Sequence, residues 1–381
     1  MEIYVMLLLL VISLSIFISS LKIDRYMKRE YFLKIIFLVI FLIYSLRSSS
    51  VGRDLFGYKQ MYLITSVKEW SDYSYIYFEK GYIFLMKICN FIGLSFQGFL
   101  MIVNFLILIP IYIFIRKYSK YPFLSVIMYI CYMFFEFNLT GIRQAIASSI
   151  VLFGIIVLIE SKKYRLLKYI VIIYLSTLFH KGAFVGFLYI PFHFINDLKK
   201  YTSIILTMFV VFILGRKYMI NFIKIYFNKG TMNANADLYI GLNFLFIIGL
   251  AILIIVAEKN RKIMWKKIIK GNINKEEILR KNFYIKEKED LINSTFNKIF
   301  LLSIGILILL GSDTSVRSSM ILNQVVLVQF PNCIDNLFKQ NSKKIAIVGI
   351  TIFFILFFLF NTLISNNFDI VPYKFFWQNN I

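Results

Sequence analysis

The sequence predicts an all-α, polytopic integral membrane protein that forms a single domain over residues 1–381, with about twelve transmembrane helices and one re-entrant helix. Three observations lead to this fold class. Hydrophobic residues make up 59% of the chain and charged residues only 17%, whereas soluble domains carry about 25% charged residues. Apolar segments of roughly 20 residues, the length that crosses a bilayer, recur almost without interruption. Basic residues gather in short clusters between these segments, as in cytoplasmic loops.

The composition also excludes several function classes. The net charge of +23 does not indicate nucleic-acid binding, because membrane proteins concentrate lysine and arginine beside the anionic lipid of the cytoplasmic leaflet. Cys89, Cys131 and Cys333 lie far apart in apolar stretches, without the spacing of a metal site or a disulfide framework. The expected surroundings are therefore the lipid bilayer, and no nucleic-acid partner is expected.

The spans can be placed in chain order from the apolar runs. No basic segment precedes the first run, so we expect a retained first helix and not a cleaved signal peptide. The predicted spans lie near residues 2–20, 31–48, 97–115, 121–138, 141–160, 164–180, 182–197, 202–216, 238–257, 297–312, 317–335 and 344–363.

The basic clusters orient these spans. Lys22, Arg25 and Lys28 follow the first span, which makes that loop cytoplasmic and places the N-terminus and the loop 49–80 outside. The basic loop 258–298 is expected to be a cytoplasmic amphipathic hairpin on the inner leaflet, with a solvated charged loop as the alternative. The later clusters predicted to be inside lie near residues 116–120, 162–165, 199–200, 258–298 and 339–344.

The segment 81–95 decides whether that orientation is consistent. It is short for a span and contains Lys87 and Asn90, so we interpret it as a re-entrant or interfacial helix. If it spans completely, the cluster that begins at Arg116 is placed outside. We prefer the re-entrant interpretation because it keeps all the basic clusters inside.

With this topology, polar residues from separate parts of the chain gather at the outer ends of spans. Their convergence predicts one cavity that opens to the outside. Arg143 is central to it, because an arginine within a span costs about 3 kcal/mol or more unless it faces water or a partner. An interfacial anchor that reaches the headgroups is the alternative. Gly141, Ala145 and Ser149 give the same helix a small-residue face for close packing, which favours a packed site.

Other members of this group have two interpretations each. His180 is either a structural hydrogen-bonding group or a proton acceptor or phosphate partner, and Gly182 and Gly186 follow it as a second close-packing pair. Asp54 and Glu79 either form surface ion pairs or take a proton from a sugar hydroxyl. Arginine grips phosphate with its planar fork. Two or three arginines at one level suggest a diphosphate ligand.

Six short motifs in order resemble one known family. They are Arg-x-x-x-Val-Gly-x-Asp-x-x-x-Tyr (47–58), Glu-x-Gly-Tyr (79–82), Arg-Gln-x-Ile-Ala (143–147), Phe-His-x-x-Ala (179–183), Arg317 and Pro-Tyr-Lys-Phe (372–375). The chain thereby resembles the EpsG family of bacterial polysaccharide polymerases, which is related to the Wzy-type O-antigen polymerases. The resemblance covers nearly the whole chain. It departs from the family at Arg53, where members often have Thr or Ser.

The resemblance implies a glycosyltransferase with a fold similar to the GT-C class, in the bacterial cytoplasmic (inner) membrane with its active site facing outward. Its partners would be undecaprenyl-diphosphate-linked glycans, together with flippase and chain-length regulator proteins. The product would be capsule, exopolysaccharide or O-antigen. No cofactor is expected, and no Asp-x-Asp motif occurs, which predicts metal independence.

The resemblance also assigns roles within the outer group. The arginines would neutralise the departing diphosphate, a carboxylate or His180 would act as general base, and the tyrosines would contact sugar. The candidate catalytic residues are Asp54, His180 and Glu79. The candidate substrate-binding residues are Arg143, Arg317, Arg47, Arg53, Gln144, Tyr58 and Tyr82.

Three other functions stay open. A polysaccharide ligase would use the same arginines with a different acceptor. A lipid-linked oligosaccharide flippase or exporter is the alternative from another class, although no internal repeat is evident, whereas transporters often contain repeats. A membrane O-acetyltransferase also commonly depends on a membrane histidine, but the predicted outer position of His180 argues against an acyl donor from the cytoplasm.

Overall fold

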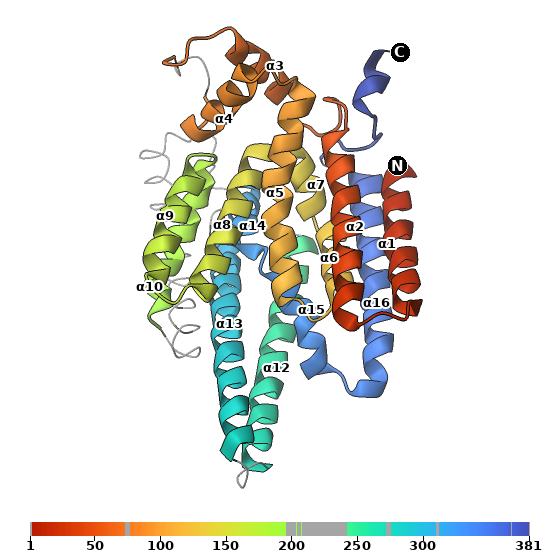
Figure 1. The fold of residues 1–381 in the computed structure, drawn as a ribbon, viewed down its shortest axis with the longest axis vertical. Coiled ribbons are helices and arrows are strands. Elements are labelled where there is room, and N and C mark those ends of the chain that lie inside the picture. Colours follow the sequence, from red (N-terminus) through yellow and green to blue (C-terminus); the bar gives the residue numbers. More distant parts are fainter. Residues whose placement is uncertain are drawn as a thin grey trace.

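The computed structural model describes residues 2–72, 77–195, 242–271, 276–309, 312–366 and 368–380, together with residues 203 and 207. Within this part of the chain the regular structure is helical, and the one β-type contact is an isolated bridge between Arg47 and Phe375. The helices form a bundle that is elongated along one axis (Figure 1). The predicted all-α fold class is confirmed.

The bundle has a buried centre and an apolar periphery. In α8 (Ile142–Glu160), 78% of an 18-residue apolar window is buried in protein, but only 28% is buried in α1 (Glu2–Ser20) and in the candidate span Gln340–Thr362, which contains α16 (Gln340–Leu359). α2 (Arg25–Ser45) and α5 (Phe96–Tyr118) lie between these two environments. Because α1 and α16 expose mainly large apolar side chains, lipid is their natural surrounding.

The helix that carries Arg143 is packed as its small residues predict. The Ser149 hydroxyl donates to the carbonyl of Ile107 on α5 (2.8 Å). On another face, Ser176 of α9 (Arg165–Thr177) donates to the carbonyl of Ala147 (2.9 Å). These bonds require close approach of the backbones, which small side chains allow.

Among the described residues, five helices are long and apolar enough to cross a membrane. A sixth candidate is a bent pair, α6 (Pro122–Cys131) and α7 (Phe134–Thr140), which meet at 51°. The span predicted near 121–138 is therefore present as a bent pair of helices and not as one continuous helix. Met133 at the break adopts a left-handed φ of 49°, which a continuing α-helix does not permit. The predicted number of twelve helices is not confirmed, and the span predicted near 202–216 lies outside the described residues, except for residues 203 and 207.

The chain after α9 also differs from a simple span. α9 has 13 residues, which gives a length of about 20 Å and is short of the roughly 30 Å hydrocarbon core. The α-helix predicted over 182–197 is wrong, because the chain forms a 3₁₀ helix, η1 (Lys181–Leu188), followed by the short α10 (Tyr189–His193). Gly182 and Gly186 explain this, since glycine has poor α-helix propensity. Gly186 also packs against Ile173, where an added Cβ would approach to 2.9 Å.

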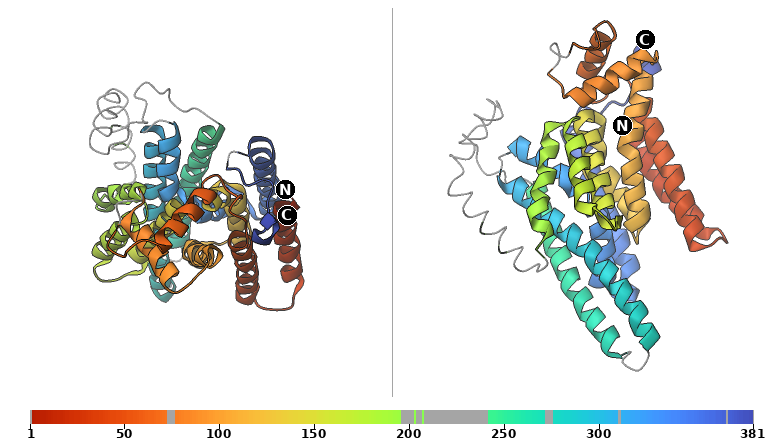
Figure 2. Two further views of the ribbon diagram at one scale, coloured as in Figure 1. Left: turned by 90° about the horizontal axis from the view of Figure 1, so that it is seen from above. Right: turned by 60° about the vertical axis from the view of Figure 1, so that its left-hand side comes forward.

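The last third of the chain contains two long helices and two broken regions. α12 (Leu242–Gly271) and α13 (Glu276–Leu309) pack side by side and project beyond the rest of the bundle (Figures 1 and 2). The described parts of the basic segment 258–298 thus belong to these two helices. The helix predicted near 317–335 is divided into α14 (Ser312–Asn323) and α15 (Val326–Leu337). α16 (Gln340–Leu359) continues into a π-helical turn, Phe360–Ser365.

The described basic clusters gather at one end of the bundle, the lower end in Figure 1. Arg116 at the end of α5 pairs with Glu30 near the start of α2 (2.6 Å). Lys117 pairs with Glu160 at the end of α8 (3.2 Å), and Lys120 pairs with Glu289 on α13 (3.4 Å). These contacts bring the described clusters to the same end, as the predicted orientation requires.

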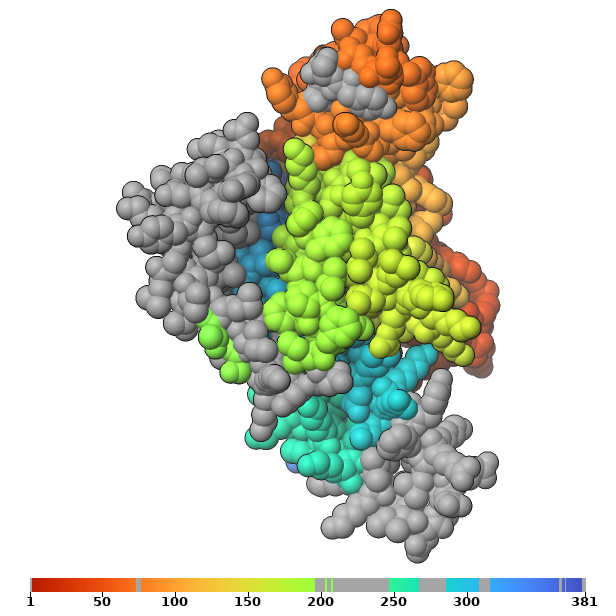
Figure 3. Space-filling model, turned by 90° about the vertical axis from the view of Figure 1, so that its left-hand side faces the viewer, coloured from red at the N-terminus to blue at the C-terminus, as the bar shows by residue number. Residues whose placement is uncertain are grey.

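The opposite, upper end carries α3 (Leu55–Ser66) and α4 (Lys80–Phe91). Both helices lie across the top of the bundle, with α4 above α9 (Figures 1 and 3). Gly81 donates to the carbonyl of Leu178 (2.9 Å), and the side chain of Gln97 contacts the carbonyl of Arg47 (3.2 Å). The segment 81–95 therefore begins and ends at the same end of the bundle; whether it enters the membrane stays a prediction.

Candidate functional site

The upper end contains a polar cavity of about 90 Å³. Its walls come from six parts of the chain: the loop before α3, α3 itself, the α7–α8 junction, the start of η1, α14 and the C-terminal segment. Seven of the ten predicted site residues line this cavity. The lining residues are Arg53, Asp54, Tyr58, Phe137, Thr140, Gly141, Arg143, Gln144, His180, Arg317 and Phe368.

A glycine positions the loop that carries Arg53 and Asp54. Gly52 has a φ of +105°, and a Cβ added there would lie 2.8 Å from the carbonyl oxygen of Leu139. Glycine is the residue that tolerates both conditions. The neighbouring backbone also bonds to the C-terminal segment, from Gly52 to the carbonyl of Asp369 (2.9 Å) and from Arg53 to that of Phe368 (3.0 Å). The Val-Gly-x-Asp motif thus folds into a turn that fits between α7 and the C-terminal segment.

Arg143 forms an ion pair with Glu79. Its Nη1 donates to Oε2 of Glu79 at 2.5 Å, and the two side chains are only 21% and 11% exposed. Its Nε lies 3.4 Å from the Tyr58 hydroxyl, and its guanidinium stacks on the Phe78 ring, 4.1 Å from the centroid. An arginine held on three sides in this way has a defined orientation. The anchor interpretation therefore does not describe Arg143, which points inward to protein.

Glu79 connects α4 to the start of η1. While Oε2 accepts from Arg143, Oε1 accepts from the backbone N–H of Lys181 (3.0 Å). Gly81 brings α4 close enough for both bonds, because its missing Cβ would lie 2.8 Å from the Leu178 carbonyl oxygen. The Glu-x-Gly motif therefore joins two parts of the chain. Both carboxylate oxygens of Glu79 are engaged, and Glu79 does not line the cavity.

His180 lines the cavity with one nitrogen committed to the backbone. Its Nδ1 accepts a hydrogen bond from the N–H of Gly182 (3.0 Å), which caps η1. An imidazole nitrogen that accepts carries no proton, so the neutral ring bears its proton on Nε2. In this form Nε2 donates, and it suits an anionic or carbonyl oxygen better than the proton of a hydroxyl group. The predicted base role is therefore less suited to His180 than the predicted phosphate-partner role.

Asp54 is the carboxylate of the cavity that is least committed. It occupies the position before α3 but forms no side-chain capping bond. Within the described parts of the chain its carboxylate forms no hydrogen bond or ion pair, whereas Arg53 beside it pairs with Asp369 (3.0 Å). Burial raises the pKa of the nearby Tyr58 phenol, although Arg143 opposes this effect. Tyr58 therefore stays protonated and can donate, whereas Asp54 is the group that can accept a proton.

Arg317 reaches the cavity from α14. The side-chain amide of Gln144 donates to the backbone carbonyl of Arg317, which joins α8 to α14. Gln144 is 3% exposed, so this bond is inside the protein and fixes the separation of the two helices. Arg317 and Arg143 thereby line one cavity, although they lie far apart in sequence.

Two predicted substrate-binding residues lie outside the cavity. Arg47 is fully buried and donates to the carbonyls of Tyr44 and Leu139, so it holds the end of α2 against α7. Tyr82 is also fully buried, and its ring packs behind Tyr58 with centroids 5.8 Å apart. The arrangement assigns supporting positions to both residues.

Sequence reasoning missed Asp369, Phe368 and Phe78. Asp369 pairs with Arg53 at the rim, Phe368 forms part of the cavity wall, and Phe78 stacks on Arg143. Their contacts are separated by up to 316 residues in sequence, and no local pattern marks them. The one available signal was the Pro-Tyr motif a few residues after Asp369. Within the described residues, no three His, Cys, Asp or Glu side chains are placed to hold a metal; metal independence stays a prediction.

The fold and the cavity define a polytopic α-helical membrane protein with an arginine-lined site at one end of its bundle. The model of the EpsG family matches residues 30–375. The chain therefore belongs to the EpsG family, and the resemblance noted in its motifs is confirmed. The family implies a membrane protein of the polysaccharide-polymerase type. Searches of curated proteins and of solved structures found no match.

Proposed function

We propose that this protein is a polysaccharide polymerase, a glycosyltransferase that joins oligosaccharide repeat units carried on undecaprenyl diphosphate. The observation that carries the proposal is the cavity that combines three arginines with an uncommitted carboxylate, Asp54. Cations suit the diphosphate of the donor, and the carboxylate suits the hydroxyl of the acceptor. Family membership supports the same reaction class.

In the proposed reaction the nascent chain is transferred from its lipid diphosphate to the incoming repeat unit. The acceptor hydroxyl oxygen forms a bond to the anomeric carbon of the nascent chain. The bond from that carbon to the diphosphate oxygen breaks, and its electron pair leaves with the lipid diphosphate. Asp54 takes the proton of the hydroxyl. The products are a chain longer by one unit and a free lipid diphosphate.

Arg143 and Arg317 stabilise the negative charge that develops on the leaving diphosphate, since preformed donors act strongly where water is excluded. The N–H of His180 Nε2 and the hydroxyl of Tyr58 add donors that carry no charge of their own. The cavity volume of about 90 Å³ equals that of about three water molecules in the liquid. This size suits phosphate groups, so the sugars extend beyond the cavity.

We place the reaction on the outer face of the bacterial cytoplasmic membrane. The cavity lies at the end of the bundle opposite the described basic clusters, and such clusters mark the cytoplasmic side. An outer cavity would receive repeat units after a flippase has moved them, and a chain-length regulator would act on the product. A GT-C-like fold, metal independence and a role in capsule, exopolysaccharide or O-antigen synthesis belong to the same proposal.

The test is a polysaccharide length analysis in cells that carry Arg143→Ala. The expected result is loss of long chains and accumulation of single lipid-linked repeat units on the outer leaflet. Lys163→Ala is the control, because it removes an exposed positive charge after α8, at the lower end. Normal chain lengths in the Arg143→Ala cells would contradict the proposal. Units retained on the inner leaflet would indicate a flippase instead, and polymer of normal length left on its lipid would indicate a ligase.

A further inference from the structure

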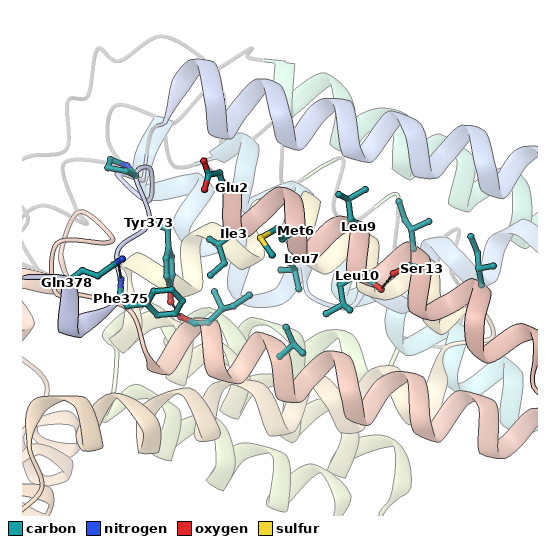
Figure 4. Close-up of a pocket in the computed structure, with 15 residues that line it drawn as sticks. Glu2, Ile3, Met6, Leu7, Leu9, Leu10, Ser13, Tyr373, Phe375 and Gln378 are labelled. Carbon is teal, nitrogen blue, oxygen red and sulfur yellow. Dashed lines mark hydrogen bonds between the residues drawn. The ribbon is translucent and has the colours of Figure 1, made fainter.

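A second, apolar hollow lies along α1. It is a groove of about 1160 Å³ between α1, α2 and the C-terminal segment 368–378. Figure 4 shows its lining side chains along α1, with Tyr373, Phe375 and Gln378 at one end. The groove walls come mainly from aliphatic and aromatic residues, including Ile3, Met6, Leu10, Val39 and Ile43.

The groove has few polar residues. Each of them either forms a hydrogen bond within the protein or lies at the end of the groove. Within the groove, the Ser13 hydroxyl turns back to the carbonyl of Leu10 (3.2 Å). At the end, the Gln378 side chain accepts from the N–H of Phe375 (2.7 Å), and Glu2 lies at the start of α1 (Figure 4). Away from this end, the groove therefore offers an apolar chain a surface without unpaired polar groups.

The length of the groove exceeds one leaflet. Its lining on α1 extends from Ile3 to Ile16, which corresponds to about 20 Å of helix. Half of the bilayer hydrocarbon core is about 15 Å. A chain that fills the groove from its upper end thus passes the midplane, which an ordinary acyl chain of the outer leaflet does not reach.

The C-terminal segment connects the polar cavity to the groove, and the two sites are only a few residues apart along it. Phe368 lines the cavity, and Pro372 and Tyr373 line the groove. Four residues of extended chain cover at most about 14 Å. Ile370 between them is held to α1, because its carbonyl accepts from the Tyr4 hydroxyl (3.0 Å). A ligand with a charged head in the cavity therefore needs only a short link to place a tail in the groove.

We propose that this groove binds the long polyprenyl chain of a lipid diphosphate whose head group occupies the polar cavity. The inference rests on the proposed function for the identity of the head group. It assigns α1 and α2, which contribute no side chain to the cavity, to recognition of the lipid. Ordinary phospholipid in the groove is the competing occupant, and chain length distinguishes the two.

The test uses a groove-filling variant, Met6→Trp combined with Leu9→Trp, and a matched control, Phe17→Trp. Met6, Leu9 and Phe17 are all more than 60% exposed, so the larger rings do not disturb the core. Of these three residues, only Met6 and Leu9 line the groove. In vesicles, the KM for repeat units on a polyprenyl chain of full length is compared with the KM for units on a ten-carbon tail.

The double variant is expected to raise the ratio of long-tail KM to short-tail KM by at least about tenfold, which corresponds to about two methylene groups that lose burial. Phe17→Trp should leave the ratio unchanged. An unchanged ratio in the double variant would overturn the proposal, as would an equal rise for both tails.

A second measurement does not depend on polymerisation. A polyprenyl diphosphate without sugar, photoreactive at the far end of its chain, should label α1 or α2 in the unmodified protein. Excess polyprenyl diphosphate should compete with this label, and excess phospholipid should not. Labelling competed equally by phospholipid would show ordinary membrane lipid and would overturn the inference. Specific labelling in a protein that polymerises nothing would sink the proposed function but not the groove.

Discussion

The carboxylate of Glu79 holds the guanidinium of Arg143 with an N–O distance of 2.5 Å, although 64 residues separate them. The pair joins α4 to α8 and leaves Arg143 directed at the polar cavity. In this form Glu79 occupies one edge of the arginine, and the diphosphate of the proposed substrate would have to use the other. The pair is thus both a support of the upper end and a limit on how Arg143 binds.

A double-mutant cycle should detect this coupling. Glu79→Gln and Arg143→Gln should each destabilise the protein, and together they should cost less than the sum by about 2 kcal/mol, as for a pair in contact with little solvent. The control pair is Arg53→Gln with Asp369→Asn, whose side chains are 58% and 56% exposed, and its coupling should be at most about 0.5 kcal/mol. Thermal unfolding in detergent measures both. Equal coupling in the two cycles would contradict a defined Arg143–Glu79 pair.

The assignment of the base predicts different losses at two residues. Asp54→Asn should lower turnover by about 100-fold or more, the contribution expected of a general base. His180→Gln should lower it about tenfold or less, because the Gln amide can accept from Gly182 and still donate into the cavity. Initial rates with lipid-linked repeat units compare them. If His180→Gln lowers turnover as much as Asp54→Asn does, the histidine accepts the proton and the assignment of Asp54 as the base is wrong.

Gly52, in the turn before α3, and Gly57, inside α3, should change the stability of the protein in opposite directions when replaced by alanine. Gly52→Ala should destabilise the protein by about 2 kcal/mol, because the +105° φ and the Leu139 carbonyl oxygen both oppose a Cβ. Gly57→Ala should stabilise it by about 0.5–1 kcal/mol, since Gly57 lies inside α3 with open space around it. Thermal unfolding of the two variants is the measurement. Equal changes in the unfolding temperature of the two variants would show that the turn at Gly52 has a different conformation.

Arg47 should behave as a structural residue and Arg317 as a binding residue. Arg47→Met leaves the buried carbonyls of Tyr44 and Leu139 without a donor, which should cost about 2 kcal/mol of stability. The folded fraction of the Arg47→Met variant should have an unchanged KM for lipid-linked units. Arg317 is exposed on α14, so Arg317→Ala should raise the KM for lipid-linked units with little effect on stability. A large rise in KM for Arg47→Met would place that residue in the substrate site after all.

The sequence was informative wherever one residue type had a narrow physical role. Apolar runs of sufficient length predicted helices such as α1, α5, α8 and α16 because the bilayer sets their length. The basic clusters predicted which described segments share an end. Charged residues near the other ends of spans predicted most of the cavity, since each is costly in lipid and has to face a polar space.

The breaks in the helices were not predictable from composition. The bend at Met133 occurs in a segment that is as apolar as a continuous span, and the division between α14 and α15 occurs among residues that are all buried. Packing against neighbours decides these features, because tertiary contacts override local propensity. The same holds for Arg47 and Tyr82, whose motif positions suggested the site but whose side chains support it from behind.

The sequence by itself determined the all-α membrane class, the common end of the basic clusters and the family, since these depend on residue type and order. Only the tertiary structure decided which polar groups are committed to the protein itself. Glu79 is held by Arg143 and Lys181, His180 by Gly182, and Arg53 by Asp369, while Asp54 remains available in the cavity. The reason is geometric: hydrogen bonding and ion pairing act over about 3 Å, and only the folded chain brings such distant residues that close.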